Sequence, residues 1–332
     1  MAEERLLLAH GGGGRKTKEL IERLILPAVG EGTVPPVGDA EPLPDWPRLH
    51  LTTDAYTVRP LFFPGGDIGR LAVVGTANDL AVSGARPRYL ALSVVAAEGL
   101  GMETLEAVFR SVGRALRETG MVLLAGDTKV VEKGALDGLF LTTTGIGESL
   151  WEPAPRPALC RPGDVLVLSG PPGRHGAAVL AAREGMELPG LRSDLGPLWP
   201  LVEAAAAAGV RPRFMRDLTR GGLAMALNDL AAGSGLTAVV EEEAVPRDEA
   251  AEALFELMGI DRYEAASEGT LVAVVGEGEA EALLDAWRGL AAAAAVVGRL
   301  EERGEFPVLL RTVLGSERLL EAPYGEQLPR IC

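Results

Sequence analysis

The chain has 332 residues, of which 47% are hydrophobic and 5% aromatic, and its net charge at pH 7 is −15. A chain of this length is expected to fold into about two domains, and its acidic balance argues against non-specific nucleic-acid binding, because no surplus of cations is available to neutralise phosphates. The sequence has no apolar run of membrane-spanning length, an acidic N-terminus unlike a signal peptide and only two cysteines, which together predict a cytoplasmic protein with no membrane partner and no disulfide framework.

The first half of the chain predicts strands that alternate with amphipathic helices. Strands are expected at residues 5–8, 50–53, 89–97, 121–125 and 139–146, and helices at residues 18–27, 68–83 and 104–119. Asp67 is a plausible N-cap for the second helix, and Gly84 and Gly120 are plausible stops for the second and third. A loop rich in Gly and Pro is expected at residues 30–48.

Four prolines between residues 151 and 162 mark the best position for a domain boundary. Beyond it, strands are expected at residues 165–169, 237–240, 271–275 and 308–310, and helices at 175–183, 197–208, 222–232, 249–258 and 280–290. The alanine runs at 204–208 and 291–295 favour helix. The alternation predicts an α/β or α+β fold, with an N-terminal domain at residues 1–154, a C-terminal α/β domain at 155–316 and a flexible tail at 317–332.

Three aspartates are candidate ligands for a cation. Asp54 and Asp127 follow predicted strands, whereas Asp79 follows Asn78 inside an otherwise apolar helix. A charge buried there without a partner would cost several kcal/mol, so Asp79 either faces a cavity, a cation or a metal, or lies with Asn78 on an exposed stripe. Hard oxygen ligands that converge from separate elements suit Mg²⁺ bound to nucleotide phosphates.

The four glycines at residues 11–14 predict a mobile loop. Consecutive glycines let backbone N–H groups approach phosphate oxygens, although the Gly-Lys-Ser/Thr ending of a Walker A motif is missing and a plain flexible arm fits as well. Lys16, Lys18 and Lys129 are candidate phosphate-binding cations, and Lys129 is favoured because it follows Asp127 so closely.

The second half of the chain offers further candidates. Arg216 and Arg220 precede two glycines at a predicted helix start, which suits an anion, although Asp217 or Thr219 can simply cap that helix. His175 opens a predicted helix and Glu268 lies in a loop before a strand, so each is a candidate base, with a capping, surface or solvated role as the alternative. Cys160 lies in the proline-rich boundary and is better explained as a packed small residue.

The last residue of the chain is Cys332, which follows a tail that contains Pro323 and Pro329. Chain ends are usually mobile unless docked, so a thiol there can enter one active site, leave it and enter another. The prolines restrict the free chain and so lower the entropy lost on docking. A surface cysteine without a role is the alternative.

Together these segments resemble the HypE family of hydrogenase maturation proteins over nearly the whole chain. The resemblance is carried by residues 10–14, Thr52-Thr53-Asp54, residues 60–69, 78–85, 125–131 and 216–224, Ser267-Glu268-Gly269 and Pro329-Arg330-Ile331-Cys332. The glycine and aspartate motifs are shared with aminoimidazole ribonucleotide synthetase, selenophosphate synthetase and thiamine-monophosphate kinase. The terminal Pro-Arg-Ile-Cys is typical of the HypE family.

The resemblance implies a two-domain aminoimidazole ribonucleotide synthetase-like fold, in which strands of the N-terminal domain join those of a second subunit in a homodimeric β-barrel that binds ATP. It implies that the C-terminal domain closes over the nucleotide and that the tail reaches the γ-phosphate. The implied partners are the HypF carbamoyltransferase, which loads the terminal thiol, and the HypC–HypD complex, which takes the cyanide to iron.

The resemblance also implies roles for single residues, with ATP and Mg²⁺ as cofactors. ATP is expected to contact Gly12, Gly13, Thr53, Asn78, Asp79, Asp127 and Lys129, and Mg²⁺ to be held by Asp54, Asp79 and Asp127. Cys332 is expected to carry the substrate, with Lys129 beside the transferred phosphoryl group. Glu268 is the expected base, and His175 is the alternative base.

The implied activity is the ATP-dependent dehydration of a carboxamide on Cys332 to a thiocyanate, which supplies cyanide for the iron of nickel–iron hydrogenase. Because oxide is a poor leaving group, ATP is expected to phosphorylate the carbonyl oxygen before a base removes the N–H protons. Two other readings stay open. One is another ATP-dependent kinase or synthetase of the superfamily that acts on a free small molecule, and the other is a scaffold whose tail only docks on a partner.

Overall fold

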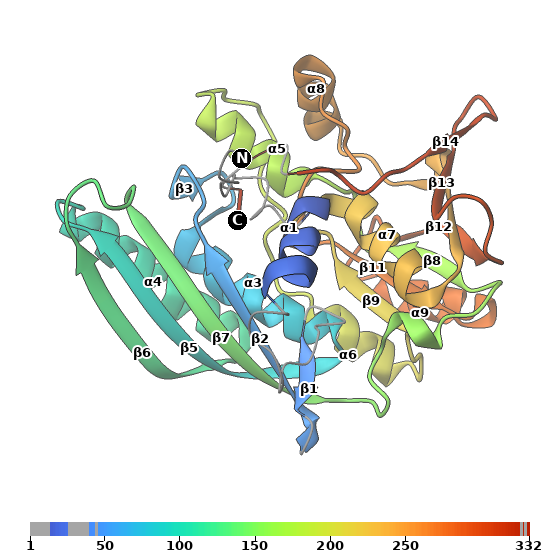
Figure 1. Cartoon of the computed structure of the whole chain (residues 1–332), viewed down its shortest axis with the longest axis horizontal. Coiled ribbons are helices and arrows are strands. Elements are labelled where there is room, and N and C mark those ends of the chain that lie inside the picture. The colour runs from blue at the N-terminus through green and yellow to red at the C-terminus, as the bar shows by residue number, and fades with distance from the viewer. Residues whose placement is uncertain (1–13, 26–39, 44–45, 326–327, 329–330) are drawn as a thin grey trace.

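The computed structural model describes residues 14–25, 40–43, 46–325, 328 and 331–332, and it holds two large sheets in two units of the chain (Figure 1). The expected strand at residues 5–8 and the glycines Gly12 and Gly13 lie outside the described residues. The first unit contains α1 Arg15–Leu20, the π-helix Ile21–Ile25, β1 Glu41–Leu43, β2 Trp46–Tyr56, β3 Phe62–Phe63, β4 Gly66–Asp67, α3 Ile68–Val82, β5 Ala85–Ala97, α4 Met102–Thr119, β6 Val122–Val131 and β7 Leu139–Ser149.

The second unit follows a short 3₁₀ turn at Pro157–Leu159. It contains β8 Val165–Leu168, α5 Arg174–Arg183, α6 Trp199–Ala207, β9 Phe214–Asp217, α7 Gly222–Ser234, β10 Thr237–Glu241, α8 Glu249–Met258, β11 Leu271–Val275, α9 Ala280–Trp287, β12 Ala295–Glu301, β13 Val308–Arg311 and β14 Glu317–Leu319. Short 3₁₀ turns at Glu242–Ala244 and Glu277–Glu279 complete it.

The first sheet has the strand order β1-β2-β7-β5-β6 and packs one face, its inner face, against α3, which in turn packs against α4. α3 is apolar around nearly its whole circumference because the sheet, α4 and the second unit enclose it. Its start is fixed by Asp67, whose carboxylate accepts hydrogen bonds from the backbone N–H groups of Gly69 and Arg70 at 2.8 and 3.2 Å. The predicted N-cap is therefore confirmed.

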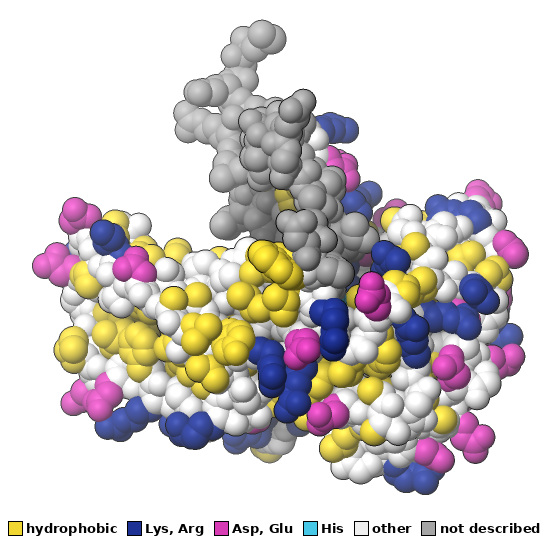
Figure 2. Space-filling model, turned by 90° about the horizontal axis from the view of Figure 1, so that it is seen from below, with side chains coloured by type: hydrophobic (Ala, Val, Ile, Leu, Met, Phe, Trp, Pro, Cys, Tyr) yellow, Lys and Arg dark blue, Asp and Glu magenta, His cyan; other side chains and the backbone are white. Residues whose placement is uncertain are grey.

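The opposite face of the first sheet, here called the outer face, carries an apolar row across four strands. Leu51, Ile146, Tyr89 and Val122 are successive cross-strand partners and so point to the same side. Leu51, Tyr89 and Val122 are 39%, 42% and 52% exposed. Figure 2 shows hydrophobic side chains gathered on the half of the molecule that holds this sheet. β6 is the edge strand and is exposed at every residue except the last.

The second unit has three layers around a sheet of order β14-β13-β10-β12-β8-β11-β9. Leu166 and Leu168 of β8 belong to a buried cluster with α7, while Val165 and Val167 belong to a cluster with α6 and α9. Because successive side chains of a strand point to opposite faces, a strand covered on both sides is apolar at every position. Among the described helices, none is long and apolar enough to cross a membrane.

Several boundaries differ from those expected. β2 and β6 continue through Asp54 and Asp127, so these aspartates lie inside strands rather than after them. β1 and the start of β2 occupy part of the expected loop, and the first helix starts at Arg15 and becomes a π-helix at Ile21. The run 291–295 ends in β12 instead of a helix, because pairing with β8 outweighs the helix propensity of alanine. β9 was not expected, and β14, within the expected tail, pairs with β13.

Candidate active site

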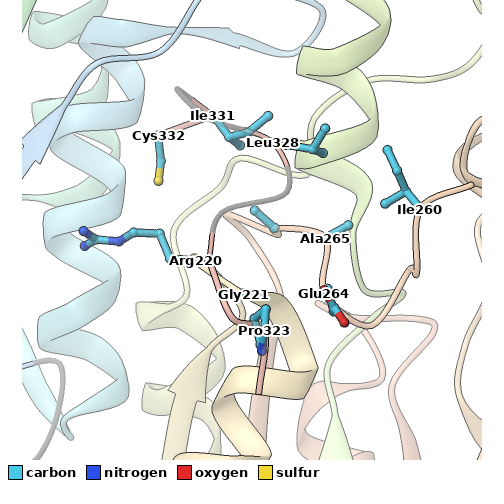
Figure 3. Close-up of a pocket in the computed structure, with 11 residues that line it drawn as sticks. Arg220, Gly221, Ile260, Glu264, Ala265, Pro323, Leu328, Ile331 and Cys332 are labelled. Carbon is cyan, nitrogen blue, oxygen red and sulfur yellow. The ribbon is translucent and has the colours of Figure 1, made fainter. Parts of the chain in front are cut away.

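The end of the chain lies between the two units, where hydrogen bonds to backbone oxygens hold its last two residues. The Ile331 carbonyl oxygen lies 3.0 Å from Nε2 of His175, and the Thr57 N–H donates to the Cys332 oxygen at 3.4 Å. The Ile331 side chain is only 3% exposed and belongs to the same buried apolar cluster as Phe63 and Val179. Figure 3 shows the Cys332 sulfur directed toward the side of the tail on which Arg220 lies. Cys332 is thus docked.

Cys332 opens into a pocket lined from both units. Its lining comprises Asp54, Ala55, Tyr56, Gly75, Asp79, Thr219, Arg220, Glu268 and Cys332. The first five residues come from β2 and α3 of the first unit, whereas Thr219 and Glu268 come from the loops that precede α7 and β11. Three carboxyl groups and one guanidinium therefore surround the thiol.

Arg220 links the acidic side of this pocket to the tail. Its Nη2 donates to Asp54 Oδ1 at 2.9 Å. Negative charge at Cys332, the C-terminal residue, is the main factor that raises the pKa of Arg220. The charges of Asp54 and Asp79 raise this pKa further, whereas burial lowers it. The second oxygen of Asp54 accepts from the Tyr56 hydroxyl at 3.2 Å, and Asp79 accepts from the Thr52 hydroxyl at 2.7 Å. The two aspartates are thereby fixed in orientation.

Glu268 is a deeply buried carboxyl group of the pocket. It is 1% exposed, and its Oε1 has no hydrogen-bond partner within the part of the chain that the structure describes. Burial first, and then the charges of Asp217, Asp194 and Asp54, raise the pKa of Glu268 well above its usual value, against the opposing charge of Arg220. A carboxylate whose pKa is raised in this way accepts a proton more readily near neutral pH, as a general base must.

His175 lies beside the same tail but is already fully engaged. It has no exposed surface, its Nδ1 lies 2.8 Å from the Ser193 hydroxyl, and its ring meets Phe63 edge to face at 5.3 Å between centroids. Burial lowers the pKa of His175, although the hydrogen bond to Ile331 and the charge of Asp194 oppose that effect. His175 is therefore a contact of the docked tail rather than a surface residue.

Asn78, which is expected to contact ATP, makes hydrogen bonds between the two units. It is 1% exposed, and its Nδ2 donates to the carbonyl oxygens of Gly196 and Glu268 at 3.1 and 2.8 Å. Its Oδ1 accepts from the Leu198 N–H at 2.8 Å. The nitrogen and the oxygen of the Asn78 amide thus both have partners, and one of these bonds holds the backbone of Glu268.

We expect Asn78→Ala to lower the free energy of unfolding by about 2–4 kcal/mol, because it leaves buried backbone groups without partners. Denaturant titration measures this change. Asn228→Ala is the matched control, since Asn228 also donates to two backbone carbonyls but lies on α7 away from the pocket. A loss of ATP affinity of about tenfold or more at unchanged stability would instead make Asn78 a nucleotide ligand.

Asp127, Lys129 and Thr53 lie on the other side of the first sheet. Asp127 pairs with Ser93 and Lys129 with Val95, which belong to the outer face of β5. Asp127 lines a shallow hollow there together with Ala91, Leu92, Ser93, Ala125, Gly126, Thr142 and Thr144. Thr53 is on the same face and donates to the Thr143 carbonyl at 2.8 Å. Within one chain these residues are separated by the sheet from Cys332.

The three aspartates expected to bind Mg²⁺ therefore do not converge in one chain. Asp54 and Asp79 share the Cys332 pocket, whereas Asp127 is three strands away and on the opposite face. In the described ranges, no cluster of three His, Cys, Asp or Glu side chains could hold a metal ion. Two carboxylates suit a cation whose remaining ligands are phosphate oxygens and water.

Sequence reasoning missed several residues that shape the site. Tyr56 could have been found, because Thr52, Asp54 and Tyr56 alternate along β2 and must share a face. Asp194 could not, since it lies in an irregular loop; its carboxylate accepts from the N–H groups of Glu268 and Gly269 and from Thr270. Arg216, a candidate anion ligand, pairs with Asp229 instead.

Comparison with known proteins supplies the family. Residues 39–149 match the N-terminal domain model of AIR synthase related proteins, and residues 161–310 match the corresponding C-terminal domain model. The carbamoyl dehydratase HypE of Cupriavidus necator is 43% identical over 333 residues, which cover 99% of this chain and 95% of that protein. The carbamoyl dehydratase HypE of Escherichia coli K12 is 41% identical, with 98% of each chain covered.

Solved structures agree with this assignment. A crystal structure of the hydrogenase maturation protein HypE in complex with ATP matches with a TM-score of 0.83 at 40% identity, covering 99% of this chain and 100% of that one. The crystal structure of a HypE–HypF complex matches with a TM-score of 0.85 at 36% identity, covering 92% and 99%. The chain therefore belongs to the HypE family of carbamoyl dehydratases, built on the two-domain AIR synthase-related fold.

Proposed function

We propose that this protein uses ATP to dehydrate a carboxamide carried on the Cys332 sulfur to a thiocyanate, which supplies cyanide for the iron of nickel–iron hydrogenase. The observation that carries the proposal is the docked position of Cys332, in one pocket with Asp54, Asp79, Arg220 and Glu268. Relatives named carbamoyl dehydratase match the chain over nearly its full length. A small-molecule kinase would need an acceptor pocket of its own, whereas here the terminal thiol occupies the pocket.

The reaction balances with one ATP. The carbonyl oxygen of the Cys332 thiocarbamate takes the γ-phosphoryl group and one N–H proton is lost, which leaves ADP and an O-phosphorylated imidate. Loss of the second N–H proton and of phosphate then forms the C≡N bond. Phosphoryl transfer requires mainly positioning and neutralisation of charge, and Arg220 provides a permanent positive charge next to the substrate-bearing residue.

Glu268 is the proposed base that removes the N–H protons. Its unpartnered Oε1, its position in the Cys332 pocket and its raised pKa support this role. His175 is the less suitable alternative, because both of its ring nitrogens already have partners while the tail is docked.

We propose that Mg²⁺ accompanies ATP, where it would neutralise charge on the phosphates. Asp54 and Asp79 are the residues of the pocket that would hold it, since both present carboxylate oxygens there. Gly12 and Gly13 remain candidates for contacts to the phosphates. Asp127 and Lys129 can approach this pocket only from a second copy of the chain.

A homodimer formed through the outer face would bring them there. The apolar row of Leu51, Ile146, Tyr89 and Val122 and the exposed edge strand β6 support such an interface, because an uncovered strand edge and apolar face favour pairing. Asp127 and Lys129 lie on β6, so the strand that would cross the interface is the one that carries them.

The proposed partners follow from the chemistry of the tail. HypF is the proposed donor of the carboxamide, supported by the relative solved in complex with HypF, and the HypC–HypD complex is the proposed acceptor of the cyanide. The cytoplasm is the proposed compartment, because the reaction starts from a reduced thiol.

Intact-mass spectrometry of the protein with HypF, carbamoyl phosphate and ATP tests the function. We expect a gain of about 43 Da and then a loss of about 18 Da, as CONH is added and water removed. Cys332→Ala is expected to show neither change. Turnover of ATP on a free small molecule by the Cys332→Ala protein would identify a kinase or synthetase. Normal binding of a partner by Cys332→Ser with no effect of ATP would identify a scaffold.

A further inference from the structure

We propose that Ser193 and His175 form a latch that holds the tail in its docked position, with Ser193 fixing the ring tautomer that His175 needs to grip Ile331. The inference rests on the proposed function, in which the tail must enter and leave this pocket. It assigns a positioning role to Ser193, a residue outside every motif of the sequence.

The hydrogen-bond pattern around the ring allows only one neutral tautomer. The Ile331 carbonyl oxygen can only accept, so Nε2 of His175, 3.0 Å away, must carry the ring proton. Nδ1 is then an acceptor, and the Ser193 hydroxyl at 2.8 Å must donate to it. The Ser193 Oγ also accepts a hydrogen bond from the Leu195 N–H at 3.0 Å, which uses a lone pair and leaves the hydroxyl hydrogen for Nδ1. Every donor in this relay therefore meets an acceptor.

The relay is anchored in the first unit as well as the second. The Ser193 N–H donates to the Pro64 carbonyl at 2.8 Å. Gly65 lies directly against Ser193, where a Cβ would come within 2.8 Å of the Ser193 backbone, and its φ of +98° also favours glycine. Phe63 of the same turn packs edge to face on the His175 ring. The latch is thus complete only when the turn at residues 63–65, the loop that holds Ser193 and the helix α5 are in contact.

The buried environment makes the latch strong and selective. His175 has no exposed surface and the Ile331 side chain is 3% exposed, so water cannot replace the bond without undocking the tail. Loss of one partner would leave a buried polar atom unsatisfied. The same arrangement keeps both ring nitrogens occupied, so His175 holds the substrate-bearing residue in place. Glu268 has an oxygen without a hydrogen-bond partner among the described residues and so can serve as the base.

Alkylation of Cys332 by iodoacetamide in the full-length chain without HypF measures docking independently of dehydration. The Cys332 thiol is half-buried when the tail is docked, so its alkylation rate should rise with the undocked fraction. We expect alkylation to become about fivefold faster in Ser193→Ala and in His175→Leu, as the loss of one buried hydrogen bond predicts. His175→Gln keeps an N–H donor and should restore part of the protection. Cys160 is a slow background site, because burial raises the pKa of its thiol to about 12.

Ser83→Ala is the matched control. Ser83 makes a 2.8 Å hydrogen bond to Nδ1 of His50, the same kind of buried pair but remote from the tail. It should leave the alkylation of Cys332 unchanged. Wild-type alkylation rates in both Ser193→Ala and His175→Leu would overturn the latch, as would an equal increase in Ser83→Ala. On the unaltered protein, nitrogen NMR must place the His175 proton on Nε2, and a proton on Nδ1 alone would also overturn it. None of these readouts requires thiocyanate formation, so the latch can fail while the proposed function stands.

Discussion

Glu268→Gln is expected to accept the carboxamide from HypF but to convert it to thiocyanate about 10²–10⁴ times more slowly. The glutamine has nearly the same shape and keeps the backbone contacts to Asn78 and Asp194, but it cannot take up a proton. The measurement is the time course of the intact mass after ATP is added to carbamoylated protein. The first mass gain should persist while the loss of water is delayed.

Glu264→Gln is the control for this substitution. Glu264 lines a neighbouring hollow that Arg220 and Cys332 also line, and burial likewise raises its pKa. It does not line the pocket that Glu268 shares with Asp54 and Asp79. It should dehydrate the substrate at close to the wild-type rate. If Glu268→Gln did the same, the base would have to be another group, and the argument from the unpartnered oxygen would fail.

The pH dependence of the wild type should carry the signature of the same carboxyl group. Because the pKa of Glu268 is raised, the fraction in the basic, deprotonated form increases as the pH rises through that pKa, and the rate of dehydration should increase with it. This increase of the rate with pH should be absent in Glu268→Gln. Arg220→Gln removes the positive charge that lowers the pKa of Glu268, so the increase of the rate should move to higher pH.

Much of the fold could be predicted from local patterns. α8 and β11 have the bounds expected from the sequence, because helix caps and apolar periodicity are local signals. Strand ends were less predictable. Thr52, Asp54 and Tyr56 alternate with outer-face residues, and β6 is exposed on both faces, so neither strand gives the apolar run that would mark its full length. The domain boundary at residue 154 stays a prediction.

Residues of the candidate site could be predicted when their side chains are chemically unusual at their positions in the sequence. They could not be predicted when their role depends on contacts with backbone groups far away in the chain. Cys332, Glu268 and Asp79 stand out in the sequence, and the structure brings them into one pocket. Asn78 stands out equally, yet its amide binds backbone groups of Gly196, Leu198 and Glu268. Ser193 has no sequence signal, since its importance depends on a contact with a helix and a turn far away in the chain.

The separation of the aspartates by the first sheet leads to the second large prediction, which rests on the proposed homodimer. A mixture of two inactive variants is expected to regain activity. Asp79→Asn and Asp127→Asn are each expected to abolish thiocyanate formation. If Asp79 of one subunit works with Asp127 of the other, a mixed dimer contains one site with both substitutions and one site with neither. With random pairing of equal amounts, about one quarter of all sites should be intact, so the mixture should show about one quarter of the wild-type rate.

The alternative, in which each subunit completes its own site, predicts a different result. Every site of the mixed dimer would then carry one substitution, and the mixture would be as inactive as its components. That outcome would require Asp127 to cross from the outer face to the Cys332 pocket within one chain, against the register that pairs it with Ser93 on β5. Asp137→Asn is a suitable control partner, because Asp137 lies in an exposed turn and pairs with Arg59. Mixed with Asp79→Asn it should give about half the wild-type rate, whichever subunit supplies Asp127, because about half of all sites then contain Asp79.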